Sequence, residues 1–510
     1  MVLSWSDIKA TIGGVFAYNE YEKNVLAHDG DSNLLKAHSH LVPLCGMEIR
    51  MVVIPNQNRL QLGAEILAQL PIIFLVHGLG GQLNQFEHIL DSLSYFATVV
   101  AIDLPGHGKS PYVDNWAAYT TDSYVALCAA ALKLPIVPPH RKVVLVGHSM
   151  GSIISLRLST VVNDCVGVAI ITPVFKSIEE AAALSRSKSI LYYVPTFLFD
   201  IFRSSVRVGG TKSKSVKAMV SHTTEDEGVL VRQLRVNLQS HSKAWLRTAY
   251  GLEFLTPEQL AQLTVPVLVI AAENDKVCTA ESALQLQKAL PDTIYSEYCT
   301  VAGAGHAVMI EKPQVLSALL STFIEAKVDK QLSAAWQLAY IASLTDKWCL
   351  KNEEKWKATE AVGNLVASSN LRGMKTLREQ DQSHSPRALE SQYPDIIAIV
   401  DISREVPPYD PKSFSKVKYH KLATVSKYPA SREEVKSFIA LIKSINANER
   451  ESIAVHCHYG FNRTGFLICC YLIEVHGLRV EDAIEAYKTS RPSGIHHPHF
   501  IEELYLRYSH

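Results

Sequence analysis

Five short apolar runs, separated by stretches of helical character, constrain the fold of the first part of the sequence more than any other feature. Each run is continuous and does not alternate with polar residues, which is typical of strands covered on both faces. Such runs alternating with helical stretches predict a parallel α/β sheet with helices packed on it. The runs are Ile72–Val76, Thr98–Ile102, Val143–Val146, Val166–Thr172 and Val267–Ala271.

The spacing of these runs also predicts the domain organisation. About ninety residues separate the fourth run from the fifth, which is too long for a connection and indicates an inserted helical cap at about residues 173–264. The pattern ends after a helix near residues 315–326, and new strand-like runs follow at Ile396–Val400 and Ile453–Val455. We therefore expect two α/β domains, at residues 1–330 and 331–510.

A serine directly after the third run is a candidate nucleophile. It lies in the motif G-x-S-x-G at Gly147–Gly151. The nucleophile of such a motif sits on a tight strand-to-helix turn, where neighbouring side chains would clash, so glycines are needed. We expect Ser149 to project at the carboxyl edge of the sheet. The N–H groups of Met150 and of Leu79, in the segment His77–Gly81, would stabilise an oxyanion there.

Two polar residues after later strands complete a possible triad. Asp275 follows the fifth run, and His306 follows a further run that ends at Val301. His306 would be the general base for Ser149, and Asp275 would fix its tautomer and stabilise the imidazolium. Glu273 is a nearby rival for the role of Asp275.

These motifs, together with the loop Asp103–Ser110, resemble the α/β-hydrolase superfamily over about residues 45–326. A serine at the turn resembles the esterases and lipases of that superfamily. The resemblance implies an α/β-hydrolase fold and a short- or medium-chain acyl ester as substrate, with Asp103 and His107 in structural roles. The aromatic segment Ile190–Phe202 leaves two interpretations of the cap open: helices that cover an apolar pocket, or a lid that faces lipid. The basic cap residues are Lys212, Lys214 and Lys217.

A cysteine near the C-terminus is a second candidate nucleophile. Cys457 begins the pattern C-x5-R between an apolar strand and an apolar helix. Backbone N–H groups in such a loop form an anion nest, and the following helix adds its positive end. Both effects lower the pKa of the thiol and favour the nucleophilic thiolate. Arg463 would hold two phosphoryl oxygens, and Thr464 would help the thiolate to leave. The expected phosphate-binding residues are His458, Tyr459, Gly460, Phe461, Asn462, Arg463 and Thr464.

The segment His456–Phe466 resembles the protein tyrosine and dual-specificity phosphatase superfamily. Over about residues 355–508 the resemblance is to the subgroup that contains the RNA 5′-triphosphatase domain of mRNA-capping enzymes. The matching segments also include Val400–Ser403, Tyr409–Asp410, Tyr419–Leu422 and Arg491–Ile495. The resemblance implies a phosphocysteine intermediate, no metal or other cofactor, and a phosphorylated protein or an RNA 5′ end as partner.

The general acid is where the sequence departs from the phosphatase pattern. The loop after the second strand, residues 423–431, contains no Asp or Glu. A phenolate leaving group, with a pKa of about 10, needs a proton, and general-acid catalysis contributes about 10²–10⁴-fold. A diphosphate leaving group is less basic, so the missing acid favours phosphoanhydride substrates over phosphoproteins. Asp401 is the remaining acid candidate, with Asp410 behind it, and loop capping is the other interpretation of both.

Charge restricts the partners that we expect. Lys plus Arg equals Asp plus Glu, 50 against 50, and residues 331–510 hold 23 basic and 21 acidic residues. This balance excludes bulk nucleic-acid binding and leaves only a local pocket for an RNA end. The chain has no K-x-D-G motif of the kind used in nucleotidyl transfer. The run His496–His499 is interpreted as surface histidines and not as a metal site.

Targeting and redox features predict a soluble chain in a reducing compartment. The N-terminus lacks a signal peptide, no apolar stretch reaches membrane-spanning length, and the nine cysteines lack the spacing of a disulfide scaffold. We expect the cytoplasm, with the nucleus left open. The alternative function is binding: the chain would be a binding module in which one of the two domains is catalytically inert.

Overall fold

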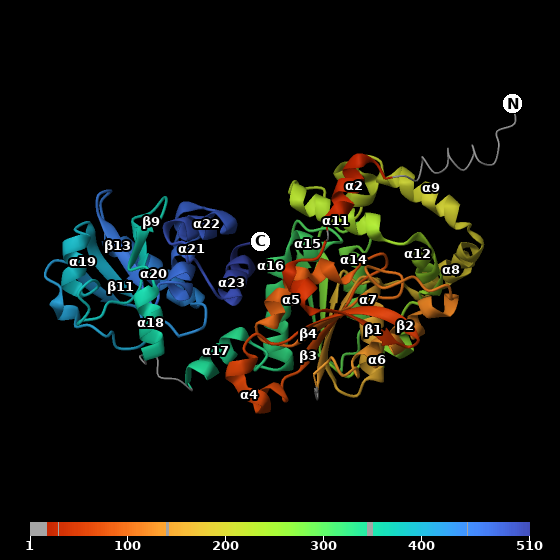
Figure 1. Ribbon diagram of the computed structural model, residues 1–510, viewed down its shortest axis with the longest axis horizontal. Helices are drawn as coiled ribbons and strands as arrows, with labels where there is room; N and C mark the ends of the chain where they lie inside the picture. Colours follow the sequence, from red (N-terminus) through yellow and green to blue (C-terminus); the bar gives the residue numbers. More distant parts are fainter. Residues whose placement is uncertain (1–17, 29, 139–141, 344–349, 446, 510) are drawn as a thin grey trace. The chain divides into compact units, whose positions relative to one another are not determined.

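The computed structural model describes residues 18–28, 30–138, 142–343, 350–445 and 447–509 (Figure 1). The described residues form two compact units, and the chain passes from one to the other between Leu332 and Ser333. Each unit is built around its own β-sheet.

The first unit contains an eight-stranded sheet with the order β1-β2-β4-β3-β5-β6-β7-β8. The strands from β4 to β8 run parallel, whereas β1 and β2 pair antiparallel at one edge. The five apolar runs of the sequence form β3 to β7, which confirms the predicted α/β class. The strands are β1 (Ser39–Leu44), β2 (Met47–Ile54), β3 (Ile72–Val76), β4 (Val99–Ile102), β5 (Val143–His148), β6 (Cys165–Ile171), β7 (Val267–Ala272) and β8 (Ser296–Val301).

Helices cover both faces of this sheet. Successive side chains of a strand point to opposite faces, and every residue of β3, β4, β5 and β7 is buried, so neither face is open to solvent there. The helices outside the β6–β7 connection are α2 (Glu20–Ala27), α3 (Asn33–His38), α4 (Arg59–Leu67), α5 (Glu87–Ser94), α6 (Thr121–Ala131), α7 (Met150–Val161), α14 (Ala280–Ala289), α15 (Val308–Glu311) and α16 (Pro313–Phe323).

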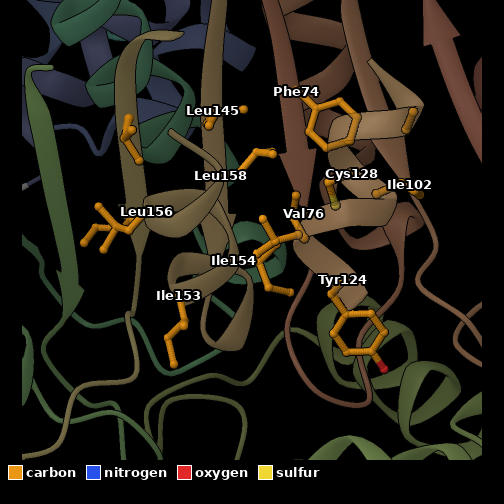
Figure 2. Packing of buried hydrophobic residues seen from close by; sticks show 14 of the residues in the cluster. Phe74, Val76, Ile102, Tyr124, Cys128, Leu145, Ile153, Ile154, Leu156 and Leu158 are labelled. Atoms are coloured by element: carbon orange, nitrogen blue, oxygen red, sulfur yellow. The ribbon is translucent and has the colours of Figure 1, made fainter. Parts of the chain in front are cut away.

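The core beside α7 fixes the position of this helix on the sheet. Figure 2 shows Ile154 and Leu158 of α7 together with Phe74 of β3 and Leu145 of β5. All four side chains are fully buried. Burial of such a side chain contributes about 1.5–3 kcal/mol, so the start of α7 is held firmly at the end of β5.

The connection between β6 and β7 is helical. Its helices are α8 (Ile178–Lys188), α9 (Thr196–Arg207), α10 (Lys214–Lys217), α11 (Glu227–Gln239), α12 (Ser242–Gly251) and α13 (Pro257–Leu260). Figure 1 shows α8 and α9 along the outer edge of this unit.

The second unit contains a five-stranded sheet with the order β12-β11-β13-β10-β9. The strands are parallel except for the β9–β10 pair. They are β9 (Val362–Leu365), β10 (Leu371–Met374), β11 (Ile396–Asp401), β12 (Lys418–Lys421) and β13 (Ser452–His456). The helices are α17 (Ala334–Ser343), α18 (Leu350–Ala358), α19 (Pro386–Gln392), α20 (Arg432–Ile445), α21 (Asn462–His476), α22 (Val480–Ser490) and α23 (Pro498–Tyr508). Within the described ranges of both units, no helix is long and apolar enough to cross a membrane.

Candidate active sites

Ser149 occupies the turn between β5 and α7. Its φ of 54° lies in the left-handed region that side chains rarely adopt, which is typical of a strained nucleophile turn. A Cβ added at Gly151 would come within 2.2 Å of the Val76 carbonyl oxygen, so this position has no room for a side chain. The sheet and the helix therefore hold Ser149 at the carboxyl end of β5.

Two backbone donors lie near this turn. Met150 is the first residue of α7, so its N–H has no partner within the helix. Leu79 belongs to the loop after β3 and lines the same cavity as His148 and His306. In the described part of the chain, neither N–H donates to another protein group. Both are thus available for an oxyanion.

His306 and Asp275 form a hydrogen-bonded pair. His306 Nδ1 lies 2.8 Å from Asp275 Oδ2, and both side chains are buried. Asp275 Oδ1 also accepts from the N–H groups of Val277 and Cys278, at 2.7 and 2.9 Å. The rival carboxylate, Glu273, accepts instead from the Gly303 N–H at 2.8 Å. The carboxylate that orients the imidazole is therefore Asp275.

Two further residues adjoin Ser149. The His148 ring packs 4.8 Å from the His306 ring, and His148 Nε2 lies 3.0 Å from the His306 carbonyl oxygen. Burial raises the pKa of the Cys278 thiol to about 12, although a hydrogen bond with Ser149 acts against this rise. Sequence reasoning missed Cys278, and its place three residues after Asp275 in the same turn was the available signal. The thiol is protonated at neutral pH and is not a competing nucleophile.

Asp103 and His107 have structural partners. Asp103 accepts from the N–H groups of Leu83 and Lys109, at 2.7 and 2.9 Å, and pairs with Arg50 at 3.3 Å. His107 Nδ1 lies 3.0 Å from the Pro105 carbonyl oxygen. These contacts fasten the loop after β4.

A cavity of about 340 Å³ adjoins this site. Its floor includes Leu79, His148 and His306, and its other walls come mainly from the helices that connect β6 with β7. The lining residues of the β6–β7 connection include Phe199, Phe202, Val206, Met219, Val236 and Trp245. A mostly apolar cavity of this size suits an acyl group.

Cys457 lies directly after β13, and the loop that follows it ends at the start of α21. Burial alone would raise the pKa of its thiol. The Arg463 guanidinium and hydrogen bonds from Thr464 and from the Gly460 N–H outweigh burial, so the pKa of Cys457 lies below its ordinary value. A lowered pKa favours the thiolate, which is the nucleophilic form.

The C-terminal part of the unit fastens this loop at three points. Asn462 Oδ1 accepts from the N–H groups of His496 and His497, at 2.7 and 2.9 Å. The Tyr487 hydroxyl donates to the Gly460 carbonyl oxygen at 2.5 Å. The fully buried Arg491 donates to the carbonyl oxygen of Tyr459 at 3.0 Å, and also to those of Gly373 and Glu360.

Gly460 is expected to be indispensable to the loop. Its φ is +71°, and an added Cβ would come within 2.2 Å of the Met374 carbonyl oxygen. Gly477, at the end of α21, has a similar φ of +68° but nothing within 4 Å of an added Cβ. Gly477→Ala should lower the free energy of unfolding by about 1 kcal/mol and Gly460→Ala by about 3 kcal/mol, because only the second adds a backbone clash. Urea denaturation of both variants measures this difference, and equal losses would contradict the clash.

Arg463 should control the pH at which Cys457 reacts. Because the guanidinium lowers the pKa of the thiol, wild-type protein is expected to be alkylated by iodoacetamide at a lower pH than Arg463→Gln. Arg463→Lys keeps the charge, so its alkylation midpoint should stay closer to that of the wild type. Mass spectrometry of the Cys457 peptide across a pH series gives the midpoints. Identical profiles for all three proteins would refute the role of the charge.

Asp401, at the end of β11, is buried within a network of donors. It accepts from Lys421 Nζ at 2.7 Å, the Tyr419 hydroxyl at 2.9 Å, and the Ser403 N–H and hydroxyl at 2.9 and 2.5 Å. Burial alone would raise the pKa of its carboxyl, but the nearby His456 and these donors lower it. A carboxylate held in this way favours the ionised form, which has no proton to donate. Asp410 caps a turn by accepting from the Lys412 N–H at 2.9 Å.

Glu405 is the carboxylate that sequence reasoning missed. It is half-buried and lines the same cavity as Cys457, Arg463 and Lys427. The loop residues His458, Tyr459, Phe461 and Asn462 line this cavity too. The Glu405 carbonyl oxygen accepts from Lys421 Nζ at 2.6 Å, which ties its loop to the Asp401 network. Glu405 lies in the loop after β11, between the two predicted candidates Asp401 and Asp410, and belongs to no motif of its own.

The histidine run His496–His499 and the loop after β12 lie close together near the cavity that Cys457 lines. His499 Nε2 lies 2.8 Å from the Lys427 carbonyl oxygen, and the His496 ring stacks on Phe461 at 4.2 Å. Arg463 Nη1 donates to the Thr424 carbonyl oxygen at 3.1 Å. Among the residues that the structure describes, no group of three or more His, Cys, Asp or Glu side chains is arranged to hold a metal.

Comparison with known proteins gives a separate result for each unit. Residues 73–319 match the alpha/beta hydrolase family, and residues 380–510 match the dual specificity phosphatase catalytic domain. An abhydrolase domain-containing protein of Schizosaccharomyces pombe is 26% identical over 269 residues, which cover 51% of this chain and 71% of the relative.

The relatives of the second unit are RNA-related by name. An mRNA-capping enzyme of Danio rerio is 38% identical over 114 residues, 22% of this chain and 19% of the relative. An RNA/RNP complex-1-interacting phosphatase of Mus musculus is 28% identical over 171 residues, 30% of this chain and 53% of the relative. The chain thus spans about a fifth and about half of these two proteins. Both resemblances drawn from the sequence are confirmed: one chain combines an alpha/beta hydrolase domain with a dual specificity phosphatase-like domain.

Proposed function

We propose that the chain is a hydrolase with two independent active sites, in domains at residues 1–330 and 331–510. The second site would be a phosphatase that works through a phosphocysteine, and the first a serine hydrolase of carboxylic esters. The observation that carries the phosphatase assignment is the placement of Cys457 directly after β13 and of Arg463 at the start of α21, where both line one cavity. We expect the protein in the cytoplasm, with the nucleus left open.

In the phosphatase reaction, the Cys457 thiolate attacks phosphorus and forms a sulfur–phosphorus bond as the bond to the leaving oxygen breaks. Arg463 and the loop N–H groups hold the equatorial oxygens and stabilise the charge on them. The leaving oxygen takes a proton from an acid or departs as the anion. Water then attacks the phosphocysteine, inorganic phosphate is released, and the thiolate is restored with help from Thr464.

In the ester reaction, Ser149 Oγ attacks the carbonyl carbon while His306 takes its proton. The Leu79 and Met150 N–H groups stabilise the oxyanion. The alcohol leaves with the proton from His306, and water, deprotonated by the same histidine, releases the acid. The 2.8 Å pair of His306 Nδ1 with Asp275 supports His306 as the base, because it leaves Nε2 of the ring to accept the proton of Ser149.

Similarity to the relatives of the second unit favours an RNA 5′ end as the substrate of the phosphatase site. The relatives of this unit are named as an mRNA-capping enzyme and an RNA-interacting phosphatase. A diphosphate is a good leaving group and needs little acid catalysis. We therefore propose a phosphoanhydride at an RNA 5′ end as the main substrate.

Phosphoproteins are the second candidate, and Glu405 favours them. A carboxyl group that lines the same cavity as Cys457 would be able to protonate the basic phenolate of phosphotyrosine, whereas the loop after β12 offers no carboxyl group. Parallel turnover of triphosphorylated RNA and of a phosphotyrosine peptide separates the two candidates. A strong preference for the peptide would refute the anhydride proposal.

Glu405→Gln tests whether this residue is the acid. Turnover of phenyl phosphate should fall by about 10²–10⁴-fold, whereas that of p-nitrophenyl phosphate should fall much less, because p-nitrophenol is the stronger acid and leaves without a proton. Asp401→Asn is the matched variant, since the sequence predicts Asp401 as the acid whereas its hydrogen-bond donors favour its ionised form. The assignment to Glu405 would be wrong if the larger loss of turnover with phenyl phosphate than with p-nitrophenyl phosphate appeared in Asp401→Asn and not in Glu405→Gln.

A further inference from the structure

Exposed apolar side chains gather on one part of the first unit. Among the described residues, 19 large apolar side chains are exposed, and nine of them lie in the short stretch that contains the end of α8 and all of α9. Scattered single residues of this kind are ordinary, but a concentration marks an interaction surface. The nine are Leu184, Ile190, Tyr192, Tyr193, Phe197, Leu198, Ile201, Phe202 and Val208.

The apolar face of α9 is wider than the cavity needs. At 100° per residue, Phe199, Phe202 and Val206 occupy one part of the helix surface, and all three line the cavity next to His306. Phe197, Leu198 and Ile201 occupy the adjoining part and are 52%, 49% and 41% exposed. Ser205 is the polar residue that falls within the outer part, whereas none falls between Leu198 and Phe202, where the cavity lining continues outward as an exposed apolar surface.

Contacts on the inner side fix which way α9 faces. Arg203 donates to the carbonyl oxygens of Ser240 and Asn237, at 2.6 and 2.8 Å, and to the Ser242 hydroxyl at 2.7 Å. The Phe199 ring packs 5.0 Å from the Trp245 ring. With these two side chains held inside, Phe197, Leu198 and Ile201 are directed away from the protein core.

The nature of the occupant follows from Phe202. This residue both lines the cavity and is 58% exposed, so it belongs to the cavity wall and to the outer surface at once. A protein seated on that surface would cover the cavity wall at this point and hinder a substrate from entering. A lipid layer would place acyl chains against the same wall, and an apolar helix face that lies flat on a membrane is a known mode of lipid binding.

We propose that the outer face of α9, formed by Phe197, Leu198 and Ile201, docks this unit on a lipid surface. The acyl lipids of that surface are then the substrate class for Ser149. The docking proposal depends only on the exposed apolar face of α9. The proposed substrate class also depends on the proposed ester hydrolysis at Ser149.

The test uses the full chain and phosphatidylcholine vesicles. The triple variant Phe197→Ser, Leu198→Ser, Ile201→Ser should lose vesicle co-sedimentation by at least about tenfold, while a soluble short-chain p-nitrophenyl ester is turned over as in the wild type. A matched control replaces Leu60 and Val161, which are 85% and 58% exposed elsewhere on the unit, with serine, and should bind as the wild type does. Binding should persist in high salt, because it is apolar.

The same experiment separates docking from catalysis. Ser149→Ala should bind vesicles normally, whatever its effect on esters. No vesicle binding by the wild-type chain, or equal binding by the triple variant, would overturn the docking proposal. A wild-type dimer that the triple variant converts to a monomer would also overturn it, since the face would then contact a second copy. Vesicle binding without release of fatty acid from the lipid would overturn the substrate class only.

Discussion

Cys457→Ser is expected to lower phosphatase turnover by at least about 10³-fold. A serine hydroxyl has a far higher pKa than the thiol, so Arg463 and Thr464 cannot make it a comparable nucleophile at neutral pH. The substrate would still enter, because the loop N–H groups and Arg463 are unchanged. The variant should therefore retain bound phosphorylated molecules. Turnover of triphosphorylated RNA and of a phosphotyrosine peptide, followed by mass spectrometry of the captured molecules, measures both effects.

Cys469→Ser is the control for this experiment. Cys469 lies in α21, and burial raises the pKa of its thiol well above the ordinary value. It should keep most of the turnover, since its thiol does not reach the cavity that Cys457 lines. Phosphatase activity that survived in Cys457→Ser would contradict the phosphocysteine mechanism.

Ser149→Ala is expected to lower ester hydrolysis by at least about 10³-fold. Without Oγ, His306 has no hydroxyl to deprotonate, and only the oxyanion donors and the cavity remain to assist water. Labelling of the chain by a fluorophosphonate should disappear with the same substitution. Turnover of p-nitrophenyl acyl esters gives the loss in rate.

Two controls accompany the serine variant. Ser152→Ala removes a nearby buried hydroxyl that donates to the Gly147 carbonyl oxygen at 3.0 Å, and it should keep ester turnover and labelling. Ser149→Ala should also keep full phosphatase activity, because the two sites belong to different units. If the wild-type chain failed to react with a fluorophosphonate, the first domain would instead be the inert binding module.

The central strands stand out in the sequence more clearly than the edge strands do. β3 and β5 are covered on both faces, so their residues form apolar runs that stand out from the chain. β12, with the sequence Lys-Tyr-His-Lys, lies at an edge and has no fully buried residue. β8 also lies at an edge and buries only Val301. An edge strand buries few of its own side chains, so it needs few apolar residues and forms only a weak apolar run in the sequence.

The nucleophiles were predictable for a related reason. Ser149 and Cys457 each directly follow a buried strand and precede a buried helix, so motif and local structure support each other. Glu405 has no such signal, because a long loop brings it to the cavity and its position depends on tertiary contacts. The sequence likewise could not indicate that Lys421 and Tyr419 both bind Asp401.

The fastening of the Cys457 loop has a consequence for truncated forms of the chain. Tyr487, Arg491 and the backbone of His496 and His497 all hold the loop, yet all follow the motif in sequence. A transcript that stopped shortly after the codons for α21 would still encode every residue of the C-x5-R signature. Its product would lack the contacts that hold the Cys457 loop, so a shortened isoform would carry the signature without the supports of that loop.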